Sequence, residues 1–185
     1  MLVILDRDGV INQYDGGYIC SADDWHPIPG SIEAVARLCN AGHRIAIATN
    51  QSGIARGYYP ASELDAMHRK LTGLVTAAGG LVDHIAFCPH HPDELCGCRK
   101  PRTGLLEEIC HCCQLDSLAG SIMVGDSRKD LEAGTCAGCR PVLVRTGNGR
   151  DTERELEANP IPGVQVAIYD NLSRFTDAFL SKQGW

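Results

Sequence analysis

The regular alternation of short apolar runs with amphipathic runs is the feature that most constrains this chain. Six short, largely apolar runs suit strands, and the segments between them carry apolar residues every three or four positions. The predicted strands span 3–5, 44–49, 85–87, 122–124, 142–144 and 166–168. Short apolar strands that alternate with helices are typical of a parallel sheet that is covered on both faces.

The intervening segments predict helices over about 32–41, 62–79, 104–114, 128–137, 151–158 and 172–182. We therefore predict a single domain over residues 1–185, a doubly wound α/β fold whose mainly parallel sheet has helices on both faces. No inserted segment is long enough to form a large cap domain. In such sheets a ligand binds beyond the carboxyl ends of the strands, so functional residues are expected there.

The charge and hydropathy of the chain limit its expected partners and its expected location in the cell. Among 185 residues, 17 are Lys or Arg and 23 are Asp or Glu, which gives a net charge of −6. An acidic protein of this kind is not expected to bind nucleic acid or an anionic membrane. No apolar run approaches the ~20 residues of a membrane-spanning helix, and the first residues do not have the pattern of a signal peptide. We expect a cytoplasmic protein.

Polar residues follow several of the predicted strands. Asp6 and Asp8 come directly after the first strand, and Asp126 follows the fourth. Three carboxylates in one crevice repel one another unless a cation joins them, and oxygen ligands suit Mg²⁺. Thr49, which ends the second strand, and Lys100, which follows the third, would then hold phosphate oxygens. Each residue alone has an ordinary explanation as a turn, cap or surface residue, but their common place at strand ends favours a phosphate site.

Arg7 and Asp130 also lie near these strand ends. Successive strand residues point to opposite faces, so Asp6 and Asp8 are expected to share a direction and Arg7 to point away. Asp130 lies one helical turn beyond Asp126. Its expected role is either support of the site or that of a plain surface acid.

Four segments resemble the motifs of the haloacid dehalogenase (HAD) superfamily of phosphotransferases. They are DRDGV at 6–10, Thr49, Lys100 and GDSRKD at 125–130. Three longer blocks are similar to the heptose bisphosphate phosphatases of that superfamily, namely LDRDGVIN at 5–12, TNQSGIARG at 49–57 and CGCRKP at 96–101. The resemblance extends from residue 2 to about residue 147 and implies a HAD-like fold.

This resemblance implies a role for each catalytic residue. Asp6 would be the nucleophile that forms an aspartyl-phosphate, and Asp8 would be the general acid and then the general base. Mg²⁺ would bind the carboxylates of Asp6 and Asp126 and the backbone carbonyl of Asp8. Thr49 and Lys100 would stabilise the transferring phosphoryl group.

The resemblance also implies a set of substrate contacts. It assigns them to Asp15, Gly16, Gly17, Tyr18, Asn50, Gln51, Ser52 and Arg99. Arg99 would recognise a second phosphate or the sugar hydroxyls. The loop 15–18 has an equally simple explanation as a glycine turn.

A cluster of cysteine and histidine predicts a second metal. Cys88, His90, Cys96 and Cys98 form the pattern C-x-H-x5-C-x-C. Three thiolates and one imidazole are typical ligands of a closed, structural zinc site, and the loop 88–98 is similar to the zinc loop of the heptose bisphosphate phosphatases. The alternatives are reduced surface thiols and, for the imidazole ligand, His91. The remaining cysteines are assigned to packing, with a second metal or redox pair at Cys136 and Cys139 as the less favoured reading.

Together these features imply a Mg²⁺-dependent phosphatase with a structural zinc. By resemblance it would remove the 7-phosphate of D-glycero-D-manno-heptose 1,7-bisphosphate, in the biosynthesis of nucleotide-activated heptose for lipopolysaccharide. Two alternatives remain open: a histidinol-phosphate phosphatase, and a catalytically inactive module that uses the zinc loop for interaction. We expect a monomer whose partner is a small sugar phosphate.

Overall fold

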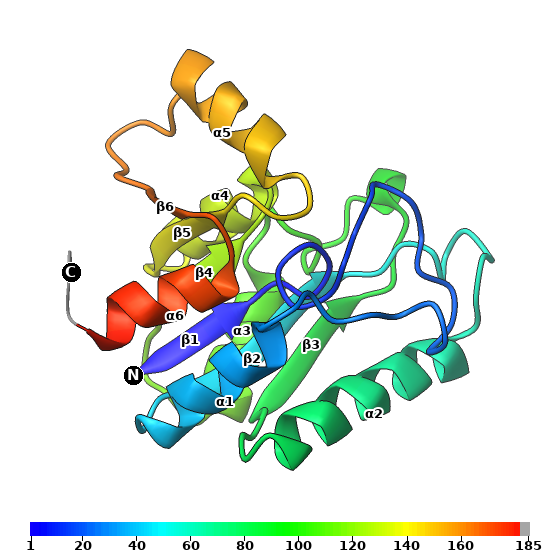
Figure 1. Ribbon diagram of the computed structural model, residues 1–185. Coiled ribbons are helices and arrows are strands. Elements are labelled where there is room, and N and C mark those ends of the chain that lie inside the picture. Colours follow the sequence, from blue (N-terminus) through cyan, green and yellow to red (C-terminus); the bar gives the residue numbers. More distant parts are fainter. Residues whose placement is uncertain (182–185) are drawn as a thin grey trace.

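The computed structural model describes residues 1–181, and a six-stranded parallel sheet forms its centre (Figure 1). The strands are β1 (Leu2–Leu5), β2 (Arg44–Asn50), β3 (His84–Cys88), β4 (Ile122–Gly125), β5 (Arg140–Val144) and β6 (Ala167–Tyr169). Their order is β3-β2-β1-β4-β5-β6, and every neighbouring pair is parallel. All six predicted strands are therefore confirmed, with ends that differ by no more than two residues.

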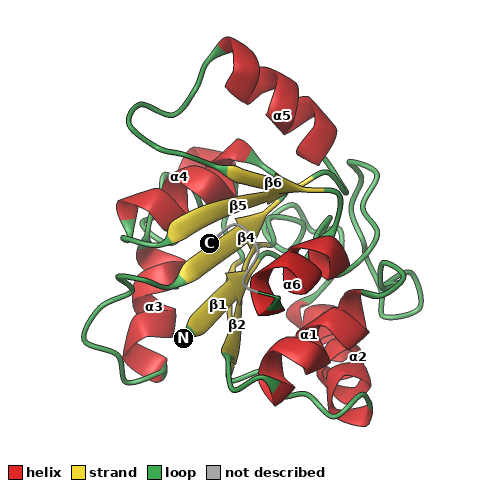
Figure 2. Cartoon of the chain, turned by 60° about the vertical axis from the view of Figure 1, so that its left-hand side comes forward, coloured by secondary structure: helices red, strands yellow, loops and turns green. Residues whose placement is uncertain are grey.

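Six α-helices connect the strands within the described range. They are α1 (Ser31–Asn40), α2 (Ala61–Ala77), α3 (Gly104–Cys112), α4 (Arg128–Cys136), α5 (Gly149–Ala158) and α6 (Leu172–Leu180). Helices α1, α2 and α6 lie on one side of the sheet, and α3 and α4 lie on the other (Figure 2). The predicted doubly wound α/β fold is thus confirmed. The last residue predicted for the final helix, 182, lies outside the described residues.

Both faces of the sheet are buried, which explains why its strands are apolar at nearly every position. In β1, Val3 and Leu5 belong to the apolar cluster that includes Phe175 of α6. The alternate residues Leu2 and Ile4 belong to the cluster on the opposite face, with α3. Because the side chains of a strand alternate between faces, one apolar strand serves two cores.

The sheet order determines where a ligand can bind. The chain runs from β1 outward to β3 on one side and from β4 outward to β6 on the other. The direction therefore reverses between β1 and β4, and in open α/β sheets the ligand crevice lies at such a switch point, beyond the carboxyl ends of the strands. Throughout residues 1–181 no inserted cap domain interrupts the alternation of strands and helices. The same residues contain no helix with the length and apolar character needed to cross a membrane.

Candidate active site

A crevice of about 230 Å³ lies at this switch point. Its walls include nearly all the residues that the sequence assigned to catalysis or substrate binding: Asp6, Asp8, Gly16, Gly17, Tyr18, Thr49, Asn50, Gln51, Ser52, Arg99, Lys100 and Asp126. Asp15 is the exception. Its carboxylate accepts a hydrogen bond of 3.2 Å from the backbone N–H of Gly17, which shapes the loop behind the wall.

Lys100 joins two carboxylates at the bottom of the crevice. Its Nζ lies 2.9 Å from Oδ1 of Asp6 and 2.6 Å from Oδ1 of Asp130, and it donates a hydrogen bond to the carbonyl of Ala48. The lysine is only 2% exposed. Burial alone would lower the pKa of Lys100, but the charges of Asp130 and Asp6 outweigh it and hold this pKa above its usual value. The lysine is therefore a fixed positive charge beside Asp6.

Asp130 is buried, not a surface acid, so of its two expected roles the structure favours support of the site. Its second oxygen accepts hydrogen bonds from the backbone N–H and the hydroxyl of Ser127, at 3.0 and 2.6 Å, which caps the start of α4. Gly125 makes this arrangement possible, because a Cβ there would lie 2.2 Å from the Cβ of Asp130. Asp130 thus connects the end of β4 to Lys100.

Asp6 and Asp126 form the acidic centre of the crevice. Burial, followed by the charge of neighbouring carboxylates, raises the pKa of Asp6 to about 7 and that of Asp126 to about 8. Oxygens of Asp6, Asp126 and Asp130 lie within 4.8 Å of one another. Lys100 pairs with both Asp6 and Asp130, and Asp126 makes no ion pair with it, so the three carboxylates leave negative charge that a cation could balance. Oxygen ligands of this kind suit Mg²⁺.

Asp126 is held in place by the loop after β5. Its Oδ2 accepts hydrogen bonds from the backbone N–H of Asn148, at 2.8 Å, and from the side-chain amide of the same residue, at 3.1 Å. Glycines at 9 and 147 leave room for this carboxylate, since a Cβ at either position would lie 2.2 Å from Oδ2. Asn148 is not recognisable from the sequence as a site residue, because its contact with Asp126 joins two separate loops and has no local signature.

The expectation that Arg7 points away from Asp8 was wrong. Arg7 donates from Nε and Nη2 to the carboxylate of Asp8, at 3.1 and 3.0 Å, although the arginine is only 1% exposed. The alternation of strand residues does not apply here, because β1 ends at Leu5. Asn12 donates a further hydrogen bond of 2.9 Å to Oδ1 of Asp8. The surroundings of Asp6 and Asp8 therefore differ: Asp6 lies beside Lys100, and Asp8 accepts two hydrogen bonds from Arg7.

The end of β2 and the residue after it connect to Asp8 and to the backbone of Lys100. Gln51 donates from Nε2 to Oδ2 of Asp8 and to Oγ1 of Thr49, each at 2.8 Å. Asn50 exchanges two hydrogen bonds with the backbone of Lys100, from Nδ2 to the carbonyl at 3.2 Å and from the backbone N–H to Oδ1 at 3.1 Å. Asn50 therefore fixes the backbone that carries the lysine, besides lining the crevice.

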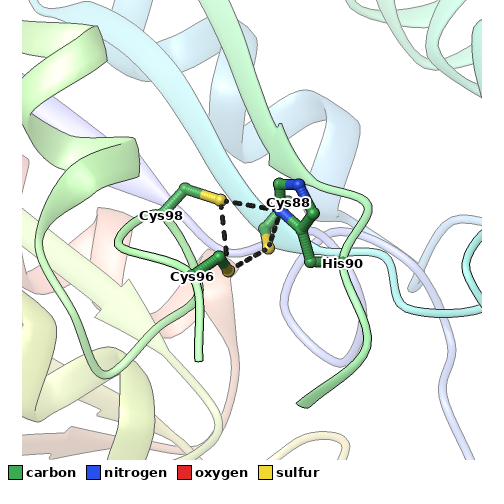
Figure 3. Close-up of side chains that lie close together, drawn as sticks. All are labelled: Cys88, His90, Cys96 and Cys98. Carbon is green, nitrogen blue, oxygen red and sulfur yellow. Dashed lines mark hydrogen bonds between the residues drawn. The ribbon is translucent and has the colours of Figure 1, made fainter. Parts of the chain in front are cut away.

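The cysteine and histidine side chains at residues 88–98 converge on one point (Figure 3). Sγ of Cys88 lies 3.6 Å from Nδ1 of His90 and 3.5 Å from Sγ of Cys96. Cys98 lies 3.2 Å from His90 and 3.5 Å from Cys96. Tetrahedral ligands of zinc, at 2.0–2.3 Å from the ion, lie roughly 3.3–3.8 Å apart. The four donors therefore fit a closed zinc site.

The contacts around the cluster distinguish its four donor side chains from neighbouring residues such as His91. His91 points elsewhere, since its Nδ1 accepts a hydrogen bond from the backbone N–H of Asp93 at the start of a short 3-10 helix, η1 (Pro92–Glu94), which the sequence did not predict. Burial opposes ionisation of Cys96, but hydrogen bonds led by the backbone N–H of Arg99 lower its pKa to about 7. Arg102 closes the loop by donating to the carbonyls of Leu95 and Cys96.

The parallel sheet and the aspartates and lysine at its carboxyl edge define a hydrolase of the HAD class. In agreement, residues 97–173 match the HAD-hydrolase-like family model. The chain is 52% identical over 172 residues to the D-glycero-beta-D-manno-heptose-1,7-bisphosphate 7-phosphatase of Pseudomonas putida, covering 93% of this chain and 95% of that protein. It is 50% identical to the phosphatase of the same name from Pseudomonas aeruginosa, covering 97% of each. The chain belongs to this family of phosphatases, the heptose bisphosphate phosphatases.

Solved structures agree with this assignment. The D,D-heptose 1,7-bisphosphate phosphatase of Bordetella bronchiseptica, solved with magnesium and phosphate, superposes with a TM-score of 0.90 at 43% identity, covering 98% of each chain. The corresponding phosphatase of Burkholderia thailandensis gives a TM-score of 0.72 at 39% identity, covering 97% of this chain and 98% of that one. The HAD-like fold is therefore confirmed, and the chain is a phosphoric monoester hydrolase.

Proposed function

We propose that this chain removes the 7-phosphate of D-glycero-β-D-manno-heptose 1,7-bisphosphate, as the names of its relatives describe. The observation that carries the proposal is the buried arrangement of Asp6, Lys100 and Asp126 at the switch point of the sheet. A nucleophilic carboxylate beside a fixed cation and a cation site is what phosphoryl transfer requires. Retention of these residues also opposes the alternative of an inactive interaction module.

In the first step, the Asp6 carboxylate attacks phosphorus, and the bond between phosphorus and the sugar oxygen breaks. Asp8 gives its proton to the leaving oxygen, so the sugar departs as an alcohol. In the second step, a water molecule attacks the aspartyl-phosphate and gives a proton to Asp8, which releases phosphate and restores both carboxyl groups. Lys100 and the Thr49 hydroxyl stabilise the oxygens of the transferring group.

Mg²⁺ is proposed as the cofactor of this reaction. The carboxylates of Asp6 and Asp126 and the backbone carbonyl of Asp8 would hold it, and it would neutralise charge on the phosphoryl group. The raised pKa values of Asp6 and Asp126 support this assignment, because two buried carboxylates are hard to ionise without a cation.

Zinc is proposed as a structural metal, held by Cys88, His90, Cys96 and Cys98. These four donors would complete a tetrahedron around zinc and would leave no position for water. Cys98 directly precedes Arg99 and Lys100, so the zinc loop would fix both cations at the crevice. Arg99, whose Nη1 is buried without a hydrogen-bond partner, is assigned to the second phosphate or to the sugar hydroxyls.

The proposal extends to the whole chain. Residues 1–185 would act as a single domain and as a cytoplasmic monomer, and the 15–18 loop with Asn50, Gln51 and Ser52 would contact the sugar phosphate. The crevice, which has room for a small ligand and opens to the surface without a cap among residues 1–181, supports a small substrate.

The test is a direct comparison of kcat/KM for heptose bisphosphate and histidinol phosphate, with Mg²⁺ present. We expect a strong preference for the heptose bisphosphate, and Asp6→Asn serves as the inactive control. Equal efficiency on both substrates would contradict the proposed specificity. Absence of hydrolysis of any phosphate ester would favour the interaction module.

A further inference from the structure

Tyr59 is the end of a chain of hydrogen bonds that leads through Gln51 to Asp8 and Thr49. The sequence assigned it no role. It lies between β2 and α2 and is only 5% exposed. Its hydroxyl lies 2.6 Å from Oε1 of Gln51. Gln51 is itself only 4% exposed. Nε2 of that same side chain lies 2.8 Å from Asp8 and 2.8 Å from Thr49. Two hydrogen bonds therefore separate the tyrosine from both.

The amide of Gln51 sets the direction of the hydrogen bonds in this chain, because its nitrogen only donates and its oxygen only accepts. The amide nitrogen of Gln51 faces Asp8 and Thr49, and its oxygen faces Tyr59. That oxygen only accepts, so the tyrosine hydroxyl is the donor. Both amide hydrogens of Gln51 are then used, one on Asp8 and one on Thr49. The hydroxyl of Thr49 accepts from the amide and keeps its own proton for a phosphoryl oxygen.

The surroundings of Tyr59 keep this donor in place. Burial raises the pKa of Tyr59 to about 12, so its hydroxyl remains protonated at neutral pH. Gly53 leaves the space that the ring occupies, because a Cβ at that position would lie 2.3 Å from Cε1 of Tyr59. Arg7 and Asn12 also donate hydrogen bonds to Asp8. The tyrosine thus orients Gln51, which is the donor to Asp8 that also donates to Thr49.

We propose that Tyr59 is a positioning residue, which acts through Gln51 to orient the carboxylate of Asp8 and the hydroxyl of Thr49 for phosphoryl transfer. The inference rests on the roles proposed above for these two residues. The terminal torsion of a glutamine has a broad, roughly twofold profile, so without the tyrosine hydroxyl the amide is held by its two donated hydrogen bonds alone and turns more easily. Both of its donations would then weaken together.

The first test compares Tyr59→Phe with Tyr58→Phe, which removes the hydroxyl of the adjacent, 53% exposed tyrosine. For the sugar bisphosphate, Tyr59→Phe should lower kcat by about fivefold, the effect of one hydrogen bond, with little change in KM. Tyr58→Phe should match the wild type. For p-nitrophenyl phosphate, whose leaving oxygen needs no proton, kcat/KM should fall less. An equal loss of kcat/KM on both substrates, or a loss confined to KM, would overturn the positioning of Asp8.

The second test is a double-mutant cycle with Gln51→Leu. If the tyrosine acts through Gln51, adding Tyr59→Phe to Gln51→Leu should cause no further loss of kcat, whereas independent effects would multiply. Melting temperatures of all variants show whether each is folded. Multiplied losses, or a Tyr59→Phe variant as active as Tyr58→Phe, would refute the inference while leaving the proposed function intact. An inactive wild type would instead refute the proposed function.

Discussion

At the scale of single residues, Asp6 and Asp8 carry the same carboxyl group in different surroundings. Asp6 lies beside Lys100, and burial raises its pKa to about 7. Asp8 accepts hydrogen bonds from Arg7, Asn12 and Gln51. The first arrangement suits a nucleophile beside a bound cation, and the second holds a carboxylate in a fixed position.

Replacement of these two aspartates is expected to separate their roles. Asp6→Asn should abolish turnover, because an amide cannot serve as the nucleophile. Asp8→Asn should lower kcat by at least ~10²-fold, since a proton transfer typically contributes ~10²–10⁴ in rate. Rapid-quench experiments with labelled substrate, followed by peptide mapping, should find phosphate on Asp6. Phosphate trapped on any other residue would contradict the mechanism.

Lys100 and Arg99 are adjacent, yet different defects are expected from their loss. Lys100→Ala should lower kcat strongly, because this lysine is proposed to bind the phosphoryl group in the transition state. Arg99→Ala should mainly reduce the preference for a bisphosphate over a monophosphate of the same sugar, since the arginine is proposed to bind remote groups. Steady-state kinetics on both substrates checks this, and identical defects would show that the division of roles is incorrect.

The individual contacts of Arg7, Tyr59 and Asn148 were beyond prediction from the sequence. The direction of Arg7 depends on β1 ending at Leu5, a boundary that strand periodicity does not fix. The partners of Tyr59 and Asn148 lie in other segments, with no regular spacing to reveal them. The proposed catalytic residues, in contrast, could be identified because each follows or ends a recognisable strand. They are Asp6, Asp8, Thr49, Lys100 and Asp126.

At the scale of elements, the six strands were predictable because burial of both faces makes them apolar throughout. Helix ends were less predictable, as in α5, which begins at Gly149 and not at 151. The helix η1 was missed because it has only three residues and no apolar periodicity. Local pattern thus locates the long elements, and tertiary contacts decide their ends.

The zinc loop provides a prediction at this scale. Cys96→Ser should weaken zinc binding, loosen residues 88–98 and reduce activity, while binding of Mg²⁺ at Asp6 and Asp126 persists. The physical reason is that a closed metal site orders a loop which would otherwise have to be ordered by substrate. Metal analysis, activity assays and calorimetric titration with Mg²⁺ on one preparation measure zinc binding, turnover and Mg²⁺ binding.

Two results would contradict this structural role for zinc. A zinc-free protein with full activity and an ordered loop would show that the metal is dispensable. A water molecule bound to the zinc in a crystal structure would indicate an open site, which is typical of a catalytic metal. Cys112→Ser, at an exposed cysteine outside the cluster, is the matched control and should leave zinc content unchanged.

At the scale of the whole molecule, the acidic centre predicts how stability depends on pH. Without a cation, the pKa values of Asp6 and Asp126 are about 7 and about 8, far above the ordinary value of 3.8. Above about pH 4 the folded state therefore holds protons that the unfolded state has released, so its stability falls as pH rises and levels off once pH has passed about 8. His68, with a pKa lowered by burial to about 4, acts in the opposite direction only at lower pH.

Between pH 6.5 and 9, the melting temperature of the protein in chelator should therefore decrease. Added Mg²⁺ should raise it most at the upper end of this range, because the cation binds the ionised carboxylates. Thermal unfolding with and without Mg²⁺ measures both effects. Asp126→Asn should flatten the pH dependence and remove most of the response to Mg²⁺. A stabilisation by Mg²⁺ that is equal at pH 6.5 and pH 9 would contradict the assignment.

The attachment of Lys100 has a consequence for the behaviour of the protein under stress. Its segment is fastened by the cysteine cluster before it and by Asn50 from the neighbouring strand. Oxidants and electrophiles that modify Cys88, Cys96 or Cys98 would displace the lysine without touching a single catalytic aspartate. We therefore expect peroxide and zinc depletion to lower turnover, even when magnesium and substrate are in excess.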